Sequence, residues 1–478
     1  RKPPGRVTDT LQVLDFGSGE LSTVADNVAD VWLSADRSTS LHRCGDEWRV
    51  LPAGKAPSGD EGRLDLSRVK LSVRLGHEWR QVMRESGRGL RDHIWTAEMS
   101  GVDWDGVYAD YEPLLSTVAT RRELGDLILE FHGELGTSHT YHQFEPPLPG
   151  DRRSTGLLGA DLARDDATGT WRVSALVDGD RWDPEGTSPL HVAGVVAGDE
   201  ILAVNGVAVD PAHGPGPALV NQVGAPVELT VRDADGRSRD VVVTPIADEY
   251  LGRYRDMVAG NRRRVHEATG GRVGYVHVPG MFPAGFGDFM REYLAEFDRE
   301  GLLVDARNNS GGHLSPLVLE KLSRRRVGET HWRHGRTQPY PLESPRGPLV
   351  GLVNEYCGSD GDMFAQAFRL MGLGPLVGAR TWGGVIGSTR LQRLVDGSNT
   401  FTPMMAISFD EAHWSVENHG VAPDVEVWRT PQDYAAGRDP QLETAIELAL
   451  AELEKRPPYE HRTAPLPVKT RPALPPRP

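Results

Sequence analysis

Short, predominantly apolar segments alternate with amphipathic ones in the C-terminal half, and this alternation limits the possible folds more than any other feature. The apolar segments include residues 301–307 and 347–355, and the amphipathic ones include residues 286–298 and 361–372. Strands without a polar face are buried on both sides, and the intervening helices supply the cover. We therefore expect an α/β layer with much parallel pairing over residues 251–456.

The first 61 residues have a different pattern. Apolar and polar residues alternate in 11–16, 28–36 and 47–51, with a Gly-Ser-Gly-Glu turn after the first of these segments. Such alternation predicts an antiparallel sheet. The segment is too short for a complete domain, so we expect 1–61 to be the last blade of a β-propeller. Because the chain begins with Arg1, we also expect it to be a piece of a longer polypeptide.

Residues 62–150 are predicted to form a small helical domain. Apolar residues recur at helical spacing over Val73–Glu98 and Tyr108–Leu135. A loop, Thr137–Tyr141, follows the last helix, and the segment EPPLPGD at 145–151 is a Pro-rich break.

Residues 151–250 are again rich in strand candidates. The run AGDEILAVNGVAV at 197–209 resembles a PDZ domain, and its Asn205-Gly206 pair predicts a tight turn with positive φ. The matching peptide-end loop is Gly156–Gly159. PDZ domains bind peptides by adding a strand to a sheet edge, and whether this groove binds a peptide stays open.

Composition excludes several classes of function. A net charge of -15 disfavours a nucleic-acid binder, which normally has a basic face. No apolar stretch approaches the ~20 residues of a membrane span, so we expect neither an anchor nor a signal peptide.

Cys44 and Cys357 have no metal-ligand spacing and fit a reducing compartment, and Cys357 is interpreted as a small buried side chain. We assign no metal and no cofactor, and we expect the Pro-rich tail, 457–478, to be extended or disordered.

Two predicted strand ends carry candidate chemistry. Ser359 lies on a Gly-flanked turn between a buried strand and a helix, where the unpaired N–H groups of the helix can stabilise a developing oxyanion. Alternatively, Ser359 only caps the helix. Gly311 and Gly312 follow the neighbouring strand and expose backbone N–H groups, or they form a simple turn. Strand ends at one edge of a parallel sheet face the same crevice.

The motifs R-N-N-S-G-G (307–312) and N-E-Y-C-G-S-D-G-D (354–362) resemble the S41 serine peptidases. One branch of that class uses a Ser/Lys dyad, but no lysine occurs between Lys321 and Lys455, and arginine cannot act as the base. The tricorn branch fits better. Its motifs resemble three segments of this chain: G-E-L-G-T-S-H-T-Y (133–141), G-S-D-G-D (358–362) and V-E-N-H-G-V-A-P-D (416–424).

The resemblance assigns roles to particular residues. It implies that Ser359 is the nucleophile, His139 the general base, and Ser138 and Glu417 a relay behind the histidine. It also implies oxyanion donors at the N–H groups of Asp360 and of a glycine, with Gly312 favoured over Gly311. An acidic residue selects basic side chains in the substrate pocket of the family, and Glu329 is the nearest candidate here.

The resemblance further implies a multidomain α+β and α/β architecture: a β-propeller end, a helical domain, a PDZ-like domain and an α/β peptidase domain. The expected function is a cytoplasmic serine endopeptidase that trims oligopeptide products of the proteasome, assembles as a homohexamer and passes its products to aminopeptidases. Two alternatives stay open: a C-terminal processing-type peptidase, and a non-catalytic PDZ scaffold that binds peptides. A scaffold needs neither His139 nor Glu417.

Overall fold

The computed structural model describes residues 9–143, 153–180, 182–183, 186–462, 464–466 and 469–470. It forms two compact units, which divide between Leu75 and Gly76. The predicted Pro-rich break at 145–151 and the last part of the predicted tail, 471–478, lie outside the described residues. Within the described ranges, no helix is both long enough and apolar enough to cross a membrane.

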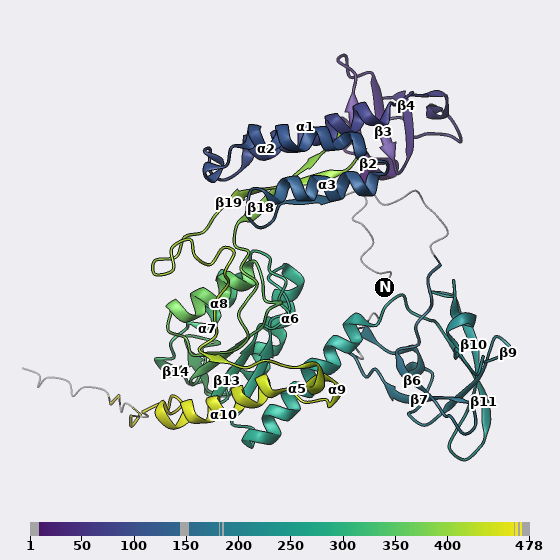
Figure 1. Ribbon diagram of the computed structural model, residues 1–478. Helices are drawn as coiled ribbons and strands as arrows, with labels where there is room; N and C mark the ends of the chain where they lie inside the picture. Colours follow the sequence, from purple (N-terminus) through teal and green to yellow (C-terminus); the bar gives the residue numbers. More distant parts are fainter. Residues whose placement is uncertain are drawn as a thin grey trace, which may run out of the picture. The chain divides into compact units, whose positions relative to one another are not determined.

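The N-terminal unit is a four-stranded antiparallel sheet in the order β1-β2-β3-β4 (Figure 1). Its strands are β1 (Asp9–Leu14), β2 (Leu21–Leu33), β3 (Thr39–Cys44) and β4 (Glu47–Pro52). The predicted turn after β1 is present, and the Asp15 carboxylate accepts the N–H groups of Gly17 and Ser18 at 2.9 and 2.7 Å. The antiparallel sheet is confirmed. One open sheet is not a propeller, so the blade assignment stays a prediction.

The second unit begins with the helical segment, whose helices are α1 (Leu75–His93), α2 (Trp104–Tyr111), the 3-10 helix η3 (Glu112–Thr117) and α3 (Arg121–Gly133). The helical spacing that we expected from Tyr108 to Leu135 is divided among the end of α2, η3 and α3. Pro113 lies in the 3-10 helix, and Thr120 starts a new helix by accepting the Glu123 N–H in a capping box. Local backbone chemistry at these two positions outweighs the apolar spacing.

A hairpin that we did not predict supports the helical segment. β18 (Gly387–Arg393) and β19 (Asn399–Met405) pair with each other, and β19 also pairs with the short β5 (Tyr141–Gln143). Leu394, at the turn of the hairpin, packs in the same buried cluster as Phe131 of α3. Residues about 260 positions apart in the sequence are thereby brought together next to the loop that carries His139.

The PDZ-like segment is rich in strands, as expected. They are β6 (Ala160–Arg164), β7 (Trp171–Leu176), β8 (Glu200–Val204), β9 (Val207–Ala208), β10 (Val227–Arg232) and β11 (Ser238–Val243). The sheet order is β11-β10-β8-β7-β6, with β9 on β8, and a short helix, α4 (Pro189–Val192), packs nearby. Asn205 and Gly206 have φ of 50° and 74°, so the predicted tight turn is confirmed.

A five-stranded parallel sheet that includes β13 forms the centre of the C-terminal region (Figure 1). The order of its strands is β12-β13-β16-β17-β20. Its strands are β12 (Val273–His277), β13 (Gly301–Asp305), β16 (Leu349–Val353), β17 (Leu376–Gly378) and β20 (Val425–Glu426). Neighbouring pairs are all parallel, so the predicted α/β layer is confirmed.

Helices cover both faces of this sheet. On β13, Leu302 and Val304 pack in one cluster with Phe289 and Phe364, whereas Leu303 packs in the opposite cluster. The first face carries α6 (Pro283–Glu296), α7 (Ser315–Leu322) and α8 (Asp360–Leu370). The second carries α5 (Tyr250–Thr269), which we did not predict, and α10 (Pro440–Lys455). A small hairpin, β14 (Gly328–Thr330) and β15 (Gln338–Tyr340), follows α7, and α9 (Pro431–Ala435) precedes α10.

The Leu394→Ala variant tests the role of the hairpin. Leu394 is 4% exposed and packs in the buried cluster that also contains Phe131 of α3. Its truncation should therefore lower the free energy of unfolding by about 2–4 kcal/mol. Val395→Ala is the matched control, because Val395 is 51% exposed. Chemical denaturation followed by circular dichroism measures both variants. Equal effects of the two substitutions would contradict a supporting role for the buried leucine.

Candidate active site

Ser359 lies on a strained turn between β16 and α8. Its φ and ψ are 58° and -120°, a conformation that side chains with a Cβ rarely adopt. The side chain makes no capping bond, although Ser359 occupies the cap position. The hydroxyl is therefore free for another partner, and Oγ lies 3.0 Å from Nε2 of His139. This geometry does not support the alternative that Ser359 serves only as a cap.

The two predicted strand ends lie together. The Asn308 N–H donates to Oδ1 of Asn354 at 2.9 Å, and the Asn354 amide donates back to Oδ1 of Asn308 at 3.0 Å. The Gly358 N–H donates to the carbonyl of Asn309 at 2.9 Å. The loop after β13 is thus bonded directly to the turn that carries Ser359, as parallel pairing of β13 and β16 requires.

The glycines of that loop approach the serine closely. A Cβ on Gly311 would lie 2.5 Å from Cβ of Ser359, so only glycine fits there. The Gly311 N–H donates to Oδ1 of Asn309 at 2.9 Å. Among the hydrogen bonds of the described residues, neither the Gly312 N–H nor the Asp360 N–H is used as a donor. These two groups stay available for an oxyanion.

His139 is placed by the loop after α3. Its φ is 59°, and its Nδ1 lies 2.9 Å from the Ser138 hydroxyl. The ring meets Trp382 and Tyr141 edge-on, with centroids 5.5 and 5.7 Å away. Burial lowers the pKa of His139 below its usual 6.5, and the negative charge of Glu417 acts in the opposite direction. A lowered pKa favours the neutral imidazole, which can accept a proton.

The Glu417 carboxylate completes the chain of hydrogen bonds. It accepts the Ser138 N–H at 2.6 Å and the Ser138 hydroxyl at 3.1 Å. Because a carboxylate only accepts, the Ser138 hydroxyl donates to Glu417 and accepts the Nδ1–H of His139. Nε2 then carries the lone pair and accepts the Ser359 O–H. Donor and acceptor chemistry thereby fixes the direction of every bond from Glu417 to Ser359.

Sequence reasoning missed the loop that supports this carboxylate. The N–H groups of Val385 and Ile386 donate to Glu417 at 2.7 and 3.1 Å.

Asp362, buried in α8, holds the same loop by accepting the Thr381 hydroxyl at 2.5 Å and the Gly383 N–H at 2.8 Å. Burial raises the pKa of Asp362 above its usual value. The Gly-Gly pair at 383–384 was the available signal for close backbone approach.

Other candidate residues lie elsewhere. Glu329 is on β14, and no bond within the described ranges links it to the Ser359–His139 chain; its carboxylate instead lies close to His331 and His461. Cys357 is fully buried, which raises the pKa of its thiol well above the usual value and confirms the interpretation as a packed apolar side chain. Lys321 forms an ion pair with Glu343 at 2.5 Å.

The peptide-end loop of the PDZ-like segment already holds a carboxylate. The Gly159 N–H donates to Oε1 of Glu249 at 2.8 Å, and Arg253 bonds both Glu249 and Asp161. Gly159 and Glu249 also line a small cavity beneath this loop. A peptide carboxylate would have to displace Glu249 from the loop.

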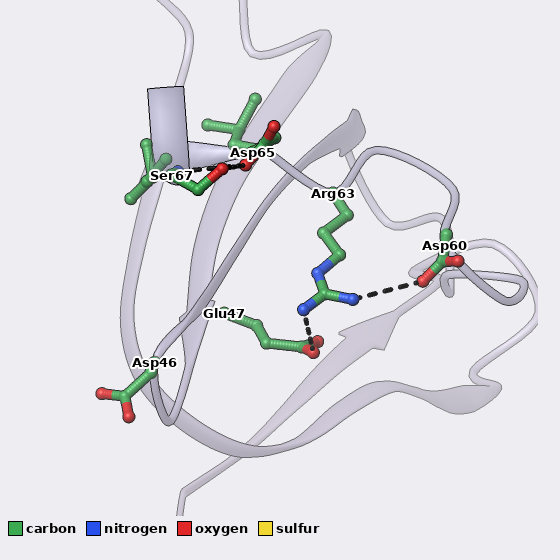
Figure 2. Close-up of a pocket in the computed structure, with 8 residues that line it drawn as sticks. Asp46, Glu47, Asp60, Arg63, Asp65 and Ser67 are labelled. Atoms are coloured by element: carbon green, nitrogen blue, oxygen red, sulfur yellow. Dashed lines mark hydrogen bonds and ion pairs between the residues drawn. The ribbon is translucent and has the colours of Figure 1, made fainter. Parts of the chain in front are cut away.

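A larger pocket, of about 530 Å³, lies in the N-terminal unit and is predominantly acidic (Figure 2). Arg63 reaches Glu47 at 3.2 Å and Asp60 at 3.5 Å, and the Asp65 carboxylate accepts the Ser67 hydroxyl at 2.6 Å. These charges are largely satisfied within the pocket itself. The pocket lies outside the segments that carry Ser359, His139 and Glu417.

Comparison with known proteins identifies the family of this chain. Three family models match the chain: the tricorn protease C1 domain at residues 76–133, the tricorn protease PDZ domain at 156–248 and peptidase family S41 at 272–427. A crystal structure of the tricorn protease superposes with a TM-score of 0.87 at 34% identity, covering 93% of this chain and 43% of that one.

Two curated relatives show the same extent of similarity. Tricorn protease homolog 1 of Streptomyces coelicolor is 50% identical over 437 residues, which cover 89% of this chain and 40% of the relative. The tricorn protease of Thermoplasma acidophilum is 34% identical over 441 residues, which cover 92% of this chain and 41% of the relative. The chain belongs to the tricorn branch of the S41 serine peptidases and corresponds to its C-terminal portion. It spans about two fifths of the length of these relatives.

The lowered pKa of His139 predicts how the reactivity of Ser359 depends on pH. The rate of labelling by a fluorophosphonate should fall on acidification with a midpoint below 6.5, because protonated His139 cannot accept the serine proton. Glu417→Gln removes the charge that raises this pKa, so the midpoint should move to still lower pH. Glu411→Gln, at an exposed carboxylate on the same segment, is the control. A midpoint above 6.5, or one that Glu417→Gln leaves in place, would contradict the arrangement.

Proposed function

We propose that this chain is the catalytic part of a serine endopeptidase that hydrolyses oligopeptides. The proposal rests chiefly on the chain of bonds from Ser359 through His139 and Ser138 to Glu417, with successive distances of 3.0, 2.9 and 3.1 Å. A nucleophile in contact with a base, and a base oriented by a third group, are what acyl transfer requires.

In this proposal Ser359 Oγ attacks the peptide carbonyl while His139 Nε2 takes the hydroxyl proton. The resulting imidazolium keeps its Nδ1–H on Ser138, and the Glu417 carboxylate stabilises the positive charge through that hydroxyl. The N–H groups of Asp360 and Gly312 bind the tetrahedral oxyanion. His139 then gives its proton to the leaving amine, and water hydrolyses the acyl-enzyme by the same steps in reverse roles.

The geometry weighs against the two alternatives. A dyad peptidase needs a neutral lysine at the serine, but Lys321 is held by Glu343, and the Ser359 hydroxyl is bonded to His139. A peptide-binding scaffold needs an accessible PDZ loop, but Glu249 occupies the Gly159 N–H. Both observations favour catalysis as the main function of this portion.

The substrate class and the assembly are further parts of the proposal, and family membership supports them. We infer that the complete protein works in the cytoplasm as a homohexamer, trims peptides released by the proteasome and passes its products to aminopeptidases. A net charge of -15 suits the attraction of basic peptides. Native mass spectrometry of the full-length protein reports the number of subunits directly.

Replacement of the nucleophile tests the proposal. Ser359→Ala should leave the fold intact and lower kcat/KM for a peptide amide by about four to six orders of magnitude. Ser323→Ala, at an exposed serine after α7, should leave the activity unchanged. Circular dichroism establishes that both variants are folded. Hydrolysis by Ser359→Ala near the wild-type rate would exclude Ser359 as the nucleophile.

The side-chain preference at P1 tests the assignment of Glu329. If its carboxylate lines the substrate pocket, Glu329→Gln should lower kcat/KM for peptides with arginine at P1 by about tenfold to a hundredfold, with little change for leucine. Glu320→Gln, at an exposed carboxylate on α7, is the control. A uniform change across P1 residues, or no change, would remove Glu329 from the pocket.

A further inference from the structure

Two segments that are distant in sequence bring together three side chains of the types that bind metal ions, and none of the three belongs to the Ser359 site. Glu329 lies on β14, His331 follows this strand, and His461 lies beyond the end of α10. One ligand atom from each residue lies within 4.8 Å of the others. Within the described residues this is the one such group found, and the proposed peptidase mechanism uses neither histidine.

Hydrogen bonds outside the group hold both segments independently of the three side chains. The Tyr459 N–H donates to the carbonyl of Arg346 at 2.7 Å, and Nε of Arg346 donates back to the Tyr459 carbonyl at 3.3 Å. Glu329 is paired with Pro339 across the β14–β15 hairpin. The first residues of the predicted tail are therefore fixed against the domain, and this placement brings His461 to the hairpin.

Both imidazoles have a second partner of the kind found behind metal ligands. Nδ1 of His331 lies 3.4 Å from the Thr337 hydroxyl, and Nδ1 of His461 lies 3.3 Å from the Tyr459 hydroxyl. A ring that donates its Nδ1–H to oxygen keeps a lone pair on Nε2, and such partners orient metal-binding histidines. The two ring centroids are 5.7 Å apart, close enough for one ion to lie between the rings.

We propose that Glu329, His331 and His461 bind a divalent transition-metal ion, with zinc as the best fit. Two imidazoles and one carboxylate are ligands that Zn²⁺ accepts in tetrahedral geometry, whereas Ca²⁺ and Mg²⁺ prefer oxygen ligands throughout. Three protein ligands leave the fourth position for water. The ion joins the segment after α10 to the hairpin and stabilises that connection.

The inference is independent of the proposed peptidase function, although both concern Glu329. Bound zinc neutralises the Glu329 carboxylate and would reduce any preference for a basic P1 side chain. The two assignments are separable, because zinc binding is measured without substrate, and P1 preference can be measured after metal removal.

The site is tested by measuring zinc binding to the purified chain. The chain is first stripped of metal with EDTA and then dialysed. Competition against a chromogenic zinc chelator should give one ion per chain for the wild type. His331→Ala and His461→Ala should each weaken binding at least tenfold, since each removes a direct ligand. His334→Ala is the control, because His334 lies on the same hairpin, exposed and outside the group.

Proteolysis supplies a readout of the connection itself. Zinc should slow tryptic cleavage after Arg462 in the wild type and in His334→Ala, but not in His331→Ala. Circular dichroism confirms that the variants are folded. Wild-type binding below one ion per chain, or equal zinc affinity in the His331, His461 and His334 variants, would overturn the proposal.

Discussion

The Glu417 carboxylate accepts hydrogen bonds from two parts of the chain that the sequence places far apart. Ser138 contributes its N–H and its hydroxyl, and Val385 and Ile386 contribute backbone N–H groups. A carboxylate that accepts several hydrogen bonds is held in one orientation. The tautomer of His139, and therefore its ability to accept the Ser359 proton, follows from that orientation.

This arrangement depends on non-local pairing. His139 is carried by the loop after α3, whereas Ser359 and Glu417 belong to the α/β region. The pairing of β5 with β19 and the burial of Leu394 against α3 fix the loop close to Ser359. The Asn418 amide adds a bond to the Gly136 carbonyl at 2.6 Å. The proposed base thus reaches its nucleophile only when the helical segment and the hairpin are packed together.

Much of the fold and of the candidate site could be predicted from the sequence where residue type dictates local geometry. The strand ends around Asn308 and Ser359, and the Asn205-Gly206 turn, follow from apolar runs and from the backbone freedom of glycine and asparagine. Helical periodicity did not reveal the break at Pro113 and Thr120. The β18–β19 hairpin is local, and the Asp-Gly pair at 396–397 was the available signal for its turn. Only its pairing with β5 joins segments that are remote in sequence.

Backbone donors were harder still to predict. The N–H groups of Val385 and Ile386 serve Glu417, but every residue except proline carries such a group, so its use depends on the fold alone. The group formed by Glu329, His331 and His461 was missed for a related reason. Its spacing in sequence is unlike any local metal motif, and docking of the segment after α10 creates it.

The central claim is that Ser138 and Glu417 act in series on His139. Measured kcat values for Ser138→Ala, Glu417→Ala and the double variant test it most directly, because residues that form one relay lose their effect together. The account predicts that each single variant lowers kcat without abolishing it, and that the double variant is little worse than the worse single one. Losses that multiply fully in the double variant would contradict the account.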